Sequence, residues 1–444
     1  MPHDRLDEIL KGRLREIRAS GTSKSGERVI CEFVPPDGKR GPRYKLQGHG
    51  DRLFLRMNAN TYLGLSFHPE MISAEESAVR AFGTGPGAVR FISGTWAPHN
   101  ELERRLADFH SREAAILFSS AYTAVMGLLP MLITPDTAVI SDELNHNCII
   151  NAIRLSSPKE KRIYKHLSLF ELEPHLEAAS KTCKRALIVT DGVFSMRGDH
   201  APLAEIMRLV RRYDPAFSEG ALAIVDDSHG VGALGQSGRG TEEITQSGPA
   251  DILVATLGKA FGVNGGYAVG DATTIEFLRE TSPFYIYSNP ITPGEAAAGV
   301  TALEILNGAP GAALLANLRE MTIRFEKGLV DLGLEIISGP HPVTPLMVRD
   351  TRRTQRLVMR IFERGVLATG LGFPVVPKGD EEIRFQICAD HTATDIDEAL
   401  EAIRSSLDPA TWQDHAKAER RIRIERSPAA IGARLREVYD LVLE

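Results

Sequence analysis

The clearest candidate for chemistry in this 444-residue sequence is Lys259, which follows an apolar stretch and stands among glycines. The stretch 251–256 is rich in aliphatic and β-branched side chains and predicts a buried strand of a parallel sheet. Gly258 and Gly262 let the backbone turn sharply and approach a ligand closely. A lysine whose pKa is lowered by burial can form a Schiff base, although a surface lysine in a strand–helix loop fits this short stretch equally well.

Polar side chains also follow two other predicted strands. Asp191 and Ser195 come after one of them, and Asp226 and His229 come after the other. Because ligands bind beyond the carboxyl ends of strands in open α/β sheets, we expect these side chains to lie near Lys259. A carboxylate, an imidazole and a lysine at one sheet edge are together stronger evidence for a catalytic site than any single motif.

This set of side chains matches the needs of pyridoxal phosphate (PLP) chemistry. The lysine bonds the cofactor aldehyde and moves the α-proton, and an acid keeps the pyridine nitrogen protonated so that the ring withdraws electrons. Asp226 fits the partner of that nitrogen, and His229 fits a donor to the phenolic oxygen. Asp227 is the weaker choice, because neighbouring side chains on a strand point to opposite faces. Alone, Asp226 is typical of a strand-end cap and His229 of an ordinary loop histidine.

The elements that would position these residues alternate between strands and helices. The expected strands of the main sheet are 115–118, 138–141, 186–190, 221–226, 252–256 and 266–269. With helical stretches between them, they predict an α/β fold with a doubly wound, mostly parallel sheet. The uncharged run from Ala114 to Pro135 is long enough to span a membrane, but its serines, glycine and prolines favour a buried helix, and no membrane span is expected.

Four parts are expected along the chain. They are an N-terminal helix and strand segment (1–58), a large α/β domain (59–300), a smaller α+β domain (301–407) and a helical extension (408–444). The first part should hold an amphipathic helix within 1–30, a loop over 35–50 and an edge strand over 52–58. Strands of the smaller domain are expected near 334–338, 346–348, 366–369 and 383–387. The arginine-rich extension is typical of solvated helices, with nucleic-acid binding as the rarer alternative.

Composition excludes several classes of protein. The 52 basic and 58 acidic residues give a net charge of −6, which argues against nucleic acid as a partner. The four cysteines are scattered without a CxxC pair, which favours free thiols over a disulfide scaffold or a metal site. The charged N-terminus has no apolar core of a secretory signal, so a cytoplasmic location is expected.

Six motifs resemble the α-oxoamine synthases, a family of fold-type I PLP enzymes, and the resemblance runs from about residue 10 to 407. The motifs are NTYLG at 60–64, VRFISGT at 89–95, SDELNH at 141–146, DGVFSMRG at 191–198, VDDSH at 225–229 and TLGK at 256–259. Within the family, the segments 145–146, 238–240 and 375–379 look most like the glycine C-acetyltransferase branch. The resemblance implies a PLP-dependent acyltransferase that condenses glycine or another small amino acid with an acyl-CoA through a cofactor-stabilised carbanion.

The resemblance also implies roles for individual residues. Catalysis would fall to Lys259 as the Schiff-base lysine, Asp226 at the pyridine nitrogen, His229 at the phenolic oxygen and His146 stacked on the ring. Further cofactor contacts would come from Ala121, Tyr122, Ser195, Thr256 and, reaching across from the partner subunit of a homodimer, Ser288. The substrate carboxylate would be held by Asn60 and Arg384, the latter as a bidentate donor. Without the family, His146 is typical of a buried polar residue at a helix start and Arg384 of a strand arginine.

Several departures from the family bear on the substrate. Relatives usually have serine at Cys148 and asparagine at Val125, and the segment 36–47 looks like an insertion. Changes of this size could alter the acyl chain or the amino acid. The alternatives are therefore a decarboxylating oxoamine synthase, of the 8-amino-7-oxononanoate synthase or serine palmitoyltransferase kind, and a PLP aminotransferase. A non-catalytic relative is disfavoured because Lys259 and Asp226 are both present.

Overall fold

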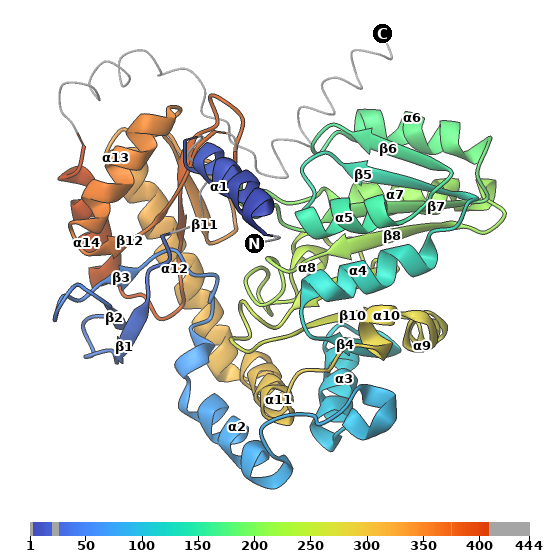
Figure 1. Cartoon of the computed structure of the whole chain (residues 1–444), viewed down its shortest axis with the longest axis horizontal. Helices are drawn as coiled ribbons and strands as arrows, with labels where there is room; N and C mark the ends of the chain where they lie inside the picture. The colour runs from blue at the N-terminus through green and yellow to red at the C-terminus, as the bar shows by residue number, and fades with distance from the viewer. Residues whose placement is uncertain (1–2, 20–25, 374, 408–444) are drawn as a thin grey trace.

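A seven-stranded sheet is the centre of the computed structural model, which describes residues 3–19, 26–373 and 375–407 (Figure 1). The strand order is β4-β10-β9-β8-β7-β5-β6. The five strands from β9 to β6 run parallel, and β10 runs antiparallel to both of its neighbours. Their bounds are β4 Ala114–Phe118, β5 Thr137–Asp142, β6 Glu160–Tyr164, β7 Arg185–Asp191, β8 Ala221–Asp226, β9 Ile252–Thr256 and β10 Gly266–Gly270. The expected α/β class with a doubly wound, mostly parallel sheet is confirmed.

Helices cover both faces of this sheet, which explains why its strands are apolar throughout. On β5, Val139 packs with α4, α5 and α9, whereas Ala138 and Ile140 pack with α6 and α7. A third apolar cluster joins the sheet to α3, α11 and the smaller part of the chain. The bounds of these helices are α3 Ala97–Phe109, α4 Ala121–Leu132, α5 Asn147–Leu155, α6 Leu169–Ser180, α7 Leu203–Tyr213, α9 Ala272–Thr281 and α11 Pro293–Asn307.

A second, smaller sheet with the order β11-β14-β13 lies on the other side of the molecule (Figure 1). Helix α12 crosses to it directly after α11, and β12 pairs with β3 from the N-terminal part. The elements here are β1 Ile30–Val34, β2 Arg43–Leu46, β3 Leu55–Arg56, β11 Val343–Met347, β12 Val366–Leu367, β13 Thr369–Leu371, β14 Glu382–Gln386, α12 Ala309–Asp331, α13 Thr351–Phe362 and α14 Ala393–Arg404. The remaining helices are α1 Asp4–Ala19, α2 Pro69–Phe82, α8 Thr241–Thr245 and α10 Pro283–Ile286.

Several expected elements were wrong in detail. The expected loop 35–50 contains strand β2. Sequence analysis missed this strand because Arg43 is charged, although its side chain is buried and forms an ion pair of 2.6 Å with Asp395. The expected strand 52–58 is only the two-residue β3, and the one expected near 334–338 is an isolated bridge at Ile336. The run from Ala114 to Pro135, expected to hold a buried helix, is strand β4, which matches the expected strand 115–118, followed by helix α4.

Other expectations remain open. Helix α11 runs without a break through the expected domain boundary at residue 300, and the division into parts stays a prediction. The extension 408–444 lies outside the described residues. Within the described ranges, no single helix is long and apolar enough to cross a membrane, although α11 and α12 pass such a test as a pair bent by 76°.

Candidate active site

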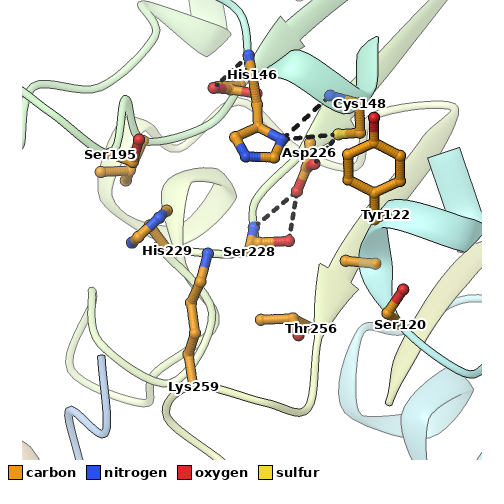
Figure 2. Close-up of a pocket in the computed structure, with 13 residues that line it drawn as sticks. Ser120, Tyr122, His146, Cys148, Ser195, Asp226, Ser228, His229, Thr256 and Lys259 are labelled. Carbon is orange, nitrogen blue, oxygen red and sulfur yellow. Dashed lines mark hydrogen bonds between the residues drawn. The ribbon is translucent and has the colours of Figure 1, made fainter. Parts of the chain in front are cut away.

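A cavity of about 230 Å³ opens where β7, β8 and β9 end and where α4 and α5 begin (Figure 2). Eight of the residues expected at the site line it, namely Ala121, Tyr122, His146, Ser195, Asp226, His229, Thr256 and Lys259. The lining also includes Ser120, Cys148, Asp191, Val193 and Ser228. Ser288, Asn60 and Arg384 are not among the lining residues. The structure therefore brings the expected cofactor residues of one chain together at a single sheet edge.

Lys259 projects into this cavity from the turn that follows β9. Burial lowers the pKa of Lys259 to about 8, because the uncharged amine loses less hydration than the ammonium ion, while Asp226 and Asp191 act in the opposite direction. An amine with such a pKa is partly unprotonated near neutral pH and can act both as a nucleophile and as a base.

Asp226 stands at the end of β8, and its two oxygens have different partners. Oδ1 accepts hydrogen bonds from the backbone N–H of Ser228 at 3.1 Å and from its hydroxyl at 2.5 Å. Oδ2 accepts only a long contact of 3.7 Å from the Cys148 thiol, so it is the oxygen available to a ligand in the cavity. The neighbouring Asp227 points away, as expected, and binds the backbone N–H and hydroxyl of Thr241 at 2.7 and 2.6 Å.

Asp191 lies beside Asp226, since the two are register partners on β7 and β8. Burial and the charge of Asp226 raise the pKa of Asp191 well above its usual range, which favours the protonated form of this second acid. Its Oδ2 accepts the backbone N–H of His146 at 3.1 Å, and its buried Oδ1 lacks a partner. Sequence reasoning gave Asp191 no role at the site, although its place at a strand end was visible.

His146 caps α5 with its side chain over the cavity. Its Nδ1 accepts the backbone N–H of Cys148 at 3.3 Å and lies 3.0 Å from the Cys148 sulfur. Burial lowers the pKa of His146, with the Lys259 charge acting in the same direction and Asp226 opposing it, so the ring is neutral. A flat, neutral imidazole at this position can cover the face of an aromatic ligand.

His229 is held from two sides. The Tyr62 hydroxyl lies 2.7 Å from Nδ1 of His229, and Nε2 of His341 lies 2.9 Å from the His229 carbonyl oxygen. Burial, together with the nearby Lys259 charge, lowers the pKa of His229 well below its usual range, so this ring is neutral too. Sequence reasoning gave no role to Tyr62, although it lies in the NTYLG motif, and missed His341, because both come from segments far from His229 in the sequence.

The first turn of α4 forms the other end of the cavity. Ser120 caps this helix and accepts the backbone N–H of Thr123 at 3.1 Å, while Ala121 and Tyr122 line the cavity. The first N–H groups of a helix have no partner within the helix and attract anions. Gly266 allows β10 to pass this turn, since a Cβ there would lie 2.1 Å from the Ala121 nitrogen.

Arg384 lies one hydrogen bond away from the cavity lining, and Asn60 lies two away, through Tyr62 and His229. Nη1 of Arg384 donates to the carbonyl oxygen of Ser195 at 2.8 Å. Asn60 accepts from the Gln386 amide at 2.9 Å and from the Tyr62 hydroxyl at 3.4 Å. Arg384 and Gln386 share one face of β14, and that two-residue spacing was the available signal for Gln386, which sequence reasoning missed.

Ser288 lies outside this cavity, just after α10, and its hydroxyl is 3.5 Å from the carbonyl oxygen of Asn289. Its expected contribution from a partner subunit stays a prediction.

The donors around the cavity fit PLP. The turn at Ala121 suits the phosphate, Asp226 offers a free oxygen for a protonated ring nitrogen, and Lys259 offers the amine for the aldehyde. His229 and Ser195 are placed to hydrogen-bond the phenolic oxygen, and His146 is placed to cover the face of the ring. Each group of the cofactor thus meets a side chain or backbone group of the matching chemistry.

Comparison with known proteins also indicates a PLP-dependent enzyme. The family model for class I and II aminotransferases matches residues 53–403. A human protein named mitochondrial 2-amino-3-ketobutyrate coenzyme A ligase is 42% identical over 401 residues, which cover 89% of this chain and 91% of that protein. An 8-amino-7-oxononanoate synthase 1 of Bacillus velezensis is 38% identical over 400 residues, covering 90% of this chain and 97% of that one. A solved structure of SPT with PLP as an internal aldimine superimposes with a TM-score of 0.81 at 25% identity, over 91% of this chain and 98% of that one.

Proposed function

Because the chain belongs to the α-oxoamine synthase family of PLP-dependent acyltransferases, we propose that it joins glycine to the acetyl group of acetyl-CoA. The observation that supports this best is the single cavity in which Lys259, Asp226 and the first turn of α4 face one another. The choice of glycine and a short acyl group follows the 2-amino-3-ketobutyrate coenzyme A ligase relative at 42% identity.

PLP, when bound, supplies an electron sink for negative charge at the α-carbon of the amino acid. Lys259 would hold the cofactor through Nζ until the amine of glycine replaces it, and the freed Nζ would then accept the α-proton, a task that suits its pKa of about 8. Asp226 keeps a proton at the ring nitrogen through Oδ2. Arg384 and Asn60 hold the substrate carboxylate, which fixes the α-carbon in front of Lys259.

The deprotonated α-carbon then forms a bond to the thioester carbonyl carbon, and the carbon–sulfur bond breaks to release CoA. The substrate carboxylate is retained in the product, 2-amino-3-ketobutyrate. A decarboxylating synthase is the alternative, supported by the 8-amino-7-oxononanoate synthase relative at 38% identity. An aminotransferase would instead convert an amino donor and a keto acid without any CoA thioester.

An assay of purified protein separates these functions. Glycine, alanine and serine are each paired with acetyl-CoA and with longer acyl-CoAs, and free thiol and CO₂ are followed together. We expect thiol release with glycine and acetyl-CoA, with CO₂ appearing only after a lag, because the product is a β-keto acid that loses CO₂ slowly in solution. CO₂ released in step with thiol would identify the decarboxylating alternative, and no thiol release with any pair would contradict an acyltransferase.

The protein is further proposed to be a homodimer in which Ser288 of the partner subunit completes the phosphate site. Ser288 follows Tyr287, which is 77% exposed, and Phe91 on the nearby segment 90–94 is 67% exposed. Aromatic side chains that are exposed in one chain are typical of interfaces. Sedimentation velocity is expected to give twice the mass of one chain, and Tyr287→Asp is expected to shift the protein toward monomer and weaken PLP binding. A monomeric wild type that binds PLP fully would contradict this arrangement.

The cellular location stays a prediction. The scattered cysteines favour a reducing compartment such as the cytoplasm, whereas the human relative carries the word mitochondrial in its name.

A further inference from the structure

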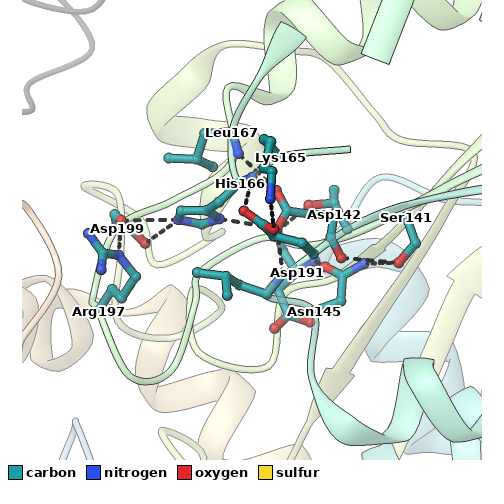
Figure 3. A network of polar contacts seen from close by, with 12 residues as sticks. Ser141, Asp142, Asn145, Lys165, His166, Leu167, Asp191, Arg197 and Asp199 are labelled. Atoms are coloured by element: carbon teal, nitrogen blue, oxygen red, sulfur yellow. Dashed lines mark hydrogen bonds and ion pairs between the residues drawn. The ribbon is translucent and has the colours of Figure 1, made fainter. Parts of the chain in front are cut away.

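A polar network that adjoins the cavity at Asp191 connects three segments of the large sheet (Figure 3). They are the turn 142–146 after β5, the segment 165–168 between β6 and α6, and the loop 192–199 after β7. The first carries His146 and the third carries Ser195, both of which line the cavity. The segment 165–168 has no role in the proposed function, although it contacts both of the other segments.

The centre of this network is His166, whose ring bridges two carboxylates. Nδ1 lies 3.1 Å from Oδ1 of Asp142, and Nε2 lies 3.3 Å from both carboxylate oxygens of Asp199. The side chains of His166, Asp142 and Asp199 are only 11%, 0% and 9% exposed. The edge of the ring also packs on Phe194, with centroids 4.4 Å apart. Burial alone would lower the pKa of His166, but the hydrogen bonds to the two carboxylates and their charges together raise it.

On one side, Asp142 organises the turn that leads to the cofactor face. It accepts the backbone N–H groups of Leu144 at 2.8 Å and of Leu167 at 2.9 Å. The turn ends at His146, whose backbone N–H reaches Asp191. A shift of Asp142 would therefore move the start of α5.

On the other side, Asp199 closes the loop that bears Ser195. The backbone N–H of Phe194 donates to the Asp199 carbonyl at 2.9 Å, and Nε of Arg197 donates to the Asp199 carboxylate at 3.0 Å. Between them, the carbonyl of Ser195 accepts Nη1 of Arg384 at 2.8 Å. The position of Arg384 thus depends on the position of this loop.

We propose that His166 is a positioning residue for the amino-acid site, holding the loop 192–199 against the turn 142–146 so that Ser195 fixes Arg384. The ring lies between two buried carboxylates, and each of its nitrogens is within hydrogen-bond distance of one of them. Without the imidazole between them, the like charges of Asp142 and Asp199 repel each other, although Asp142 keeps its backbone N–H donors and Asp199 keeps Arg197, and this repulsion favours separation of the two segments. The inference rests on the proposed function, since it assigns the substrate carboxylate to Arg384.

The test compares His166→Gln and Asp199→Asn with wild type, and uses His175→Gln on the adjacent helix α6 as a matched control. Two equilibrium constants are measured without acyl-CoA: PLP binding to the apoprotein, and glycine binding to the holoprotein from the change in cofactor absorbance. We expect both network variants to weaken glycine binding by about tenfold or more, as displaced positioning groups do. PLP binding should weaken by a smaller factor than glycine binding, because the α4 turn, Asp226 and Lys259 are untouched while only His146 and Ser195 lie on the segments that shift. The control should match wild type.

Asp199→Asn keeps the pair of His166 with Asp142, so it carries the test if His166→Gln does not fold. A folded variant with wild-type glycine binding would overturn the proposal. So would a parallel loss of PLP and glycine binding that follows the loss of thermal stability, because that pattern indicates a merely structural role. If wild-type holoprotein responds to no amino acid, the proposed function fails and this inference fails with it.

Discussion

Replacement of Lys259 by alanine is expected to lower kcat for acyl transfer by about four orders of magnitude, because one side chain supplies both the covalent attachment and the proton transfer. Lys259 points into the cavity and its amine is the one that the lining offers for both tasks. The fold should survive, since removing a poorly hydrated buried amine relieves a desolvation cost. Thiol release in the single-turnover regime gives the rate, and borohydride reduction followed by mass measurement gives the fraction of chains carrying covalently fixed PLP.

The wild-type apoprotein supplies the control for this prediction. Nucleophilic attack requires the uncharged amine, and the pKa of Lys259 is about 8. Covalent capture of PLP should therefore slow by about tenfold for each pH unit below 8 and level off above it. Lys259→Ala should show no covalent capture at any pH. Capture at another lysine with the same pH profile would contradict the assignment.

Three of the residues that sequence analysis placed at the site share one property, which is their position at or just after the carboxyl end of a strand. Asp226, His229 and Lys259 each follow a run of apolar residues, and the rule that ligands bind at carboxyl strand ends is enough to group them. The residues that it missed act across large sequence distances. Tyr62 and His229 are 167 positions apart in the sequence. Their contact depends on how the segment around Tyr62 packs on the main sheet.

The same reasoning explains which strands could be predicted. Strands buried on both faces, such as β7 and β8, are apolar runs and were found with nearly correct limits. Strand β6 was missed because it lies at the sheet edge and has the charged sequence EKRIY, in which two of the first four residues are exposed. Charge on an edge strand protects it from pairing with other chains and also conceals it from a search for apolar runs.

Asp226→Asn is expected to lower kcat by at least about two orders of magnitude, because a neutral amide cannot hold a proton on the pyridine nitrogen. The hydrogen bonds from Ser228 to Oδ1 can be kept by the amide oxygen, so the change isolates the lost charge at Oδ2. The cofactor absorbance should report an unprotonated ring even where PLP remains bound.

Asp191→Asn is the matched control, since Asp191 lies next to Asp226 in register and is equally buried. Because burial and the charge of Asp226 raise the pKa of Asp191, an amide of the same size is a small change in charge at this position and should reduce kcat by less than about tenfold. Unequal effects of two identical substitutions on adjacent strands would show that charge at one position, and not the shape of the pair, supports the reaction. Equal losses would mean that both acids serve only to pack the sheet edge, and the assignment of Asp226 to the ring nitrogen would then be wrong.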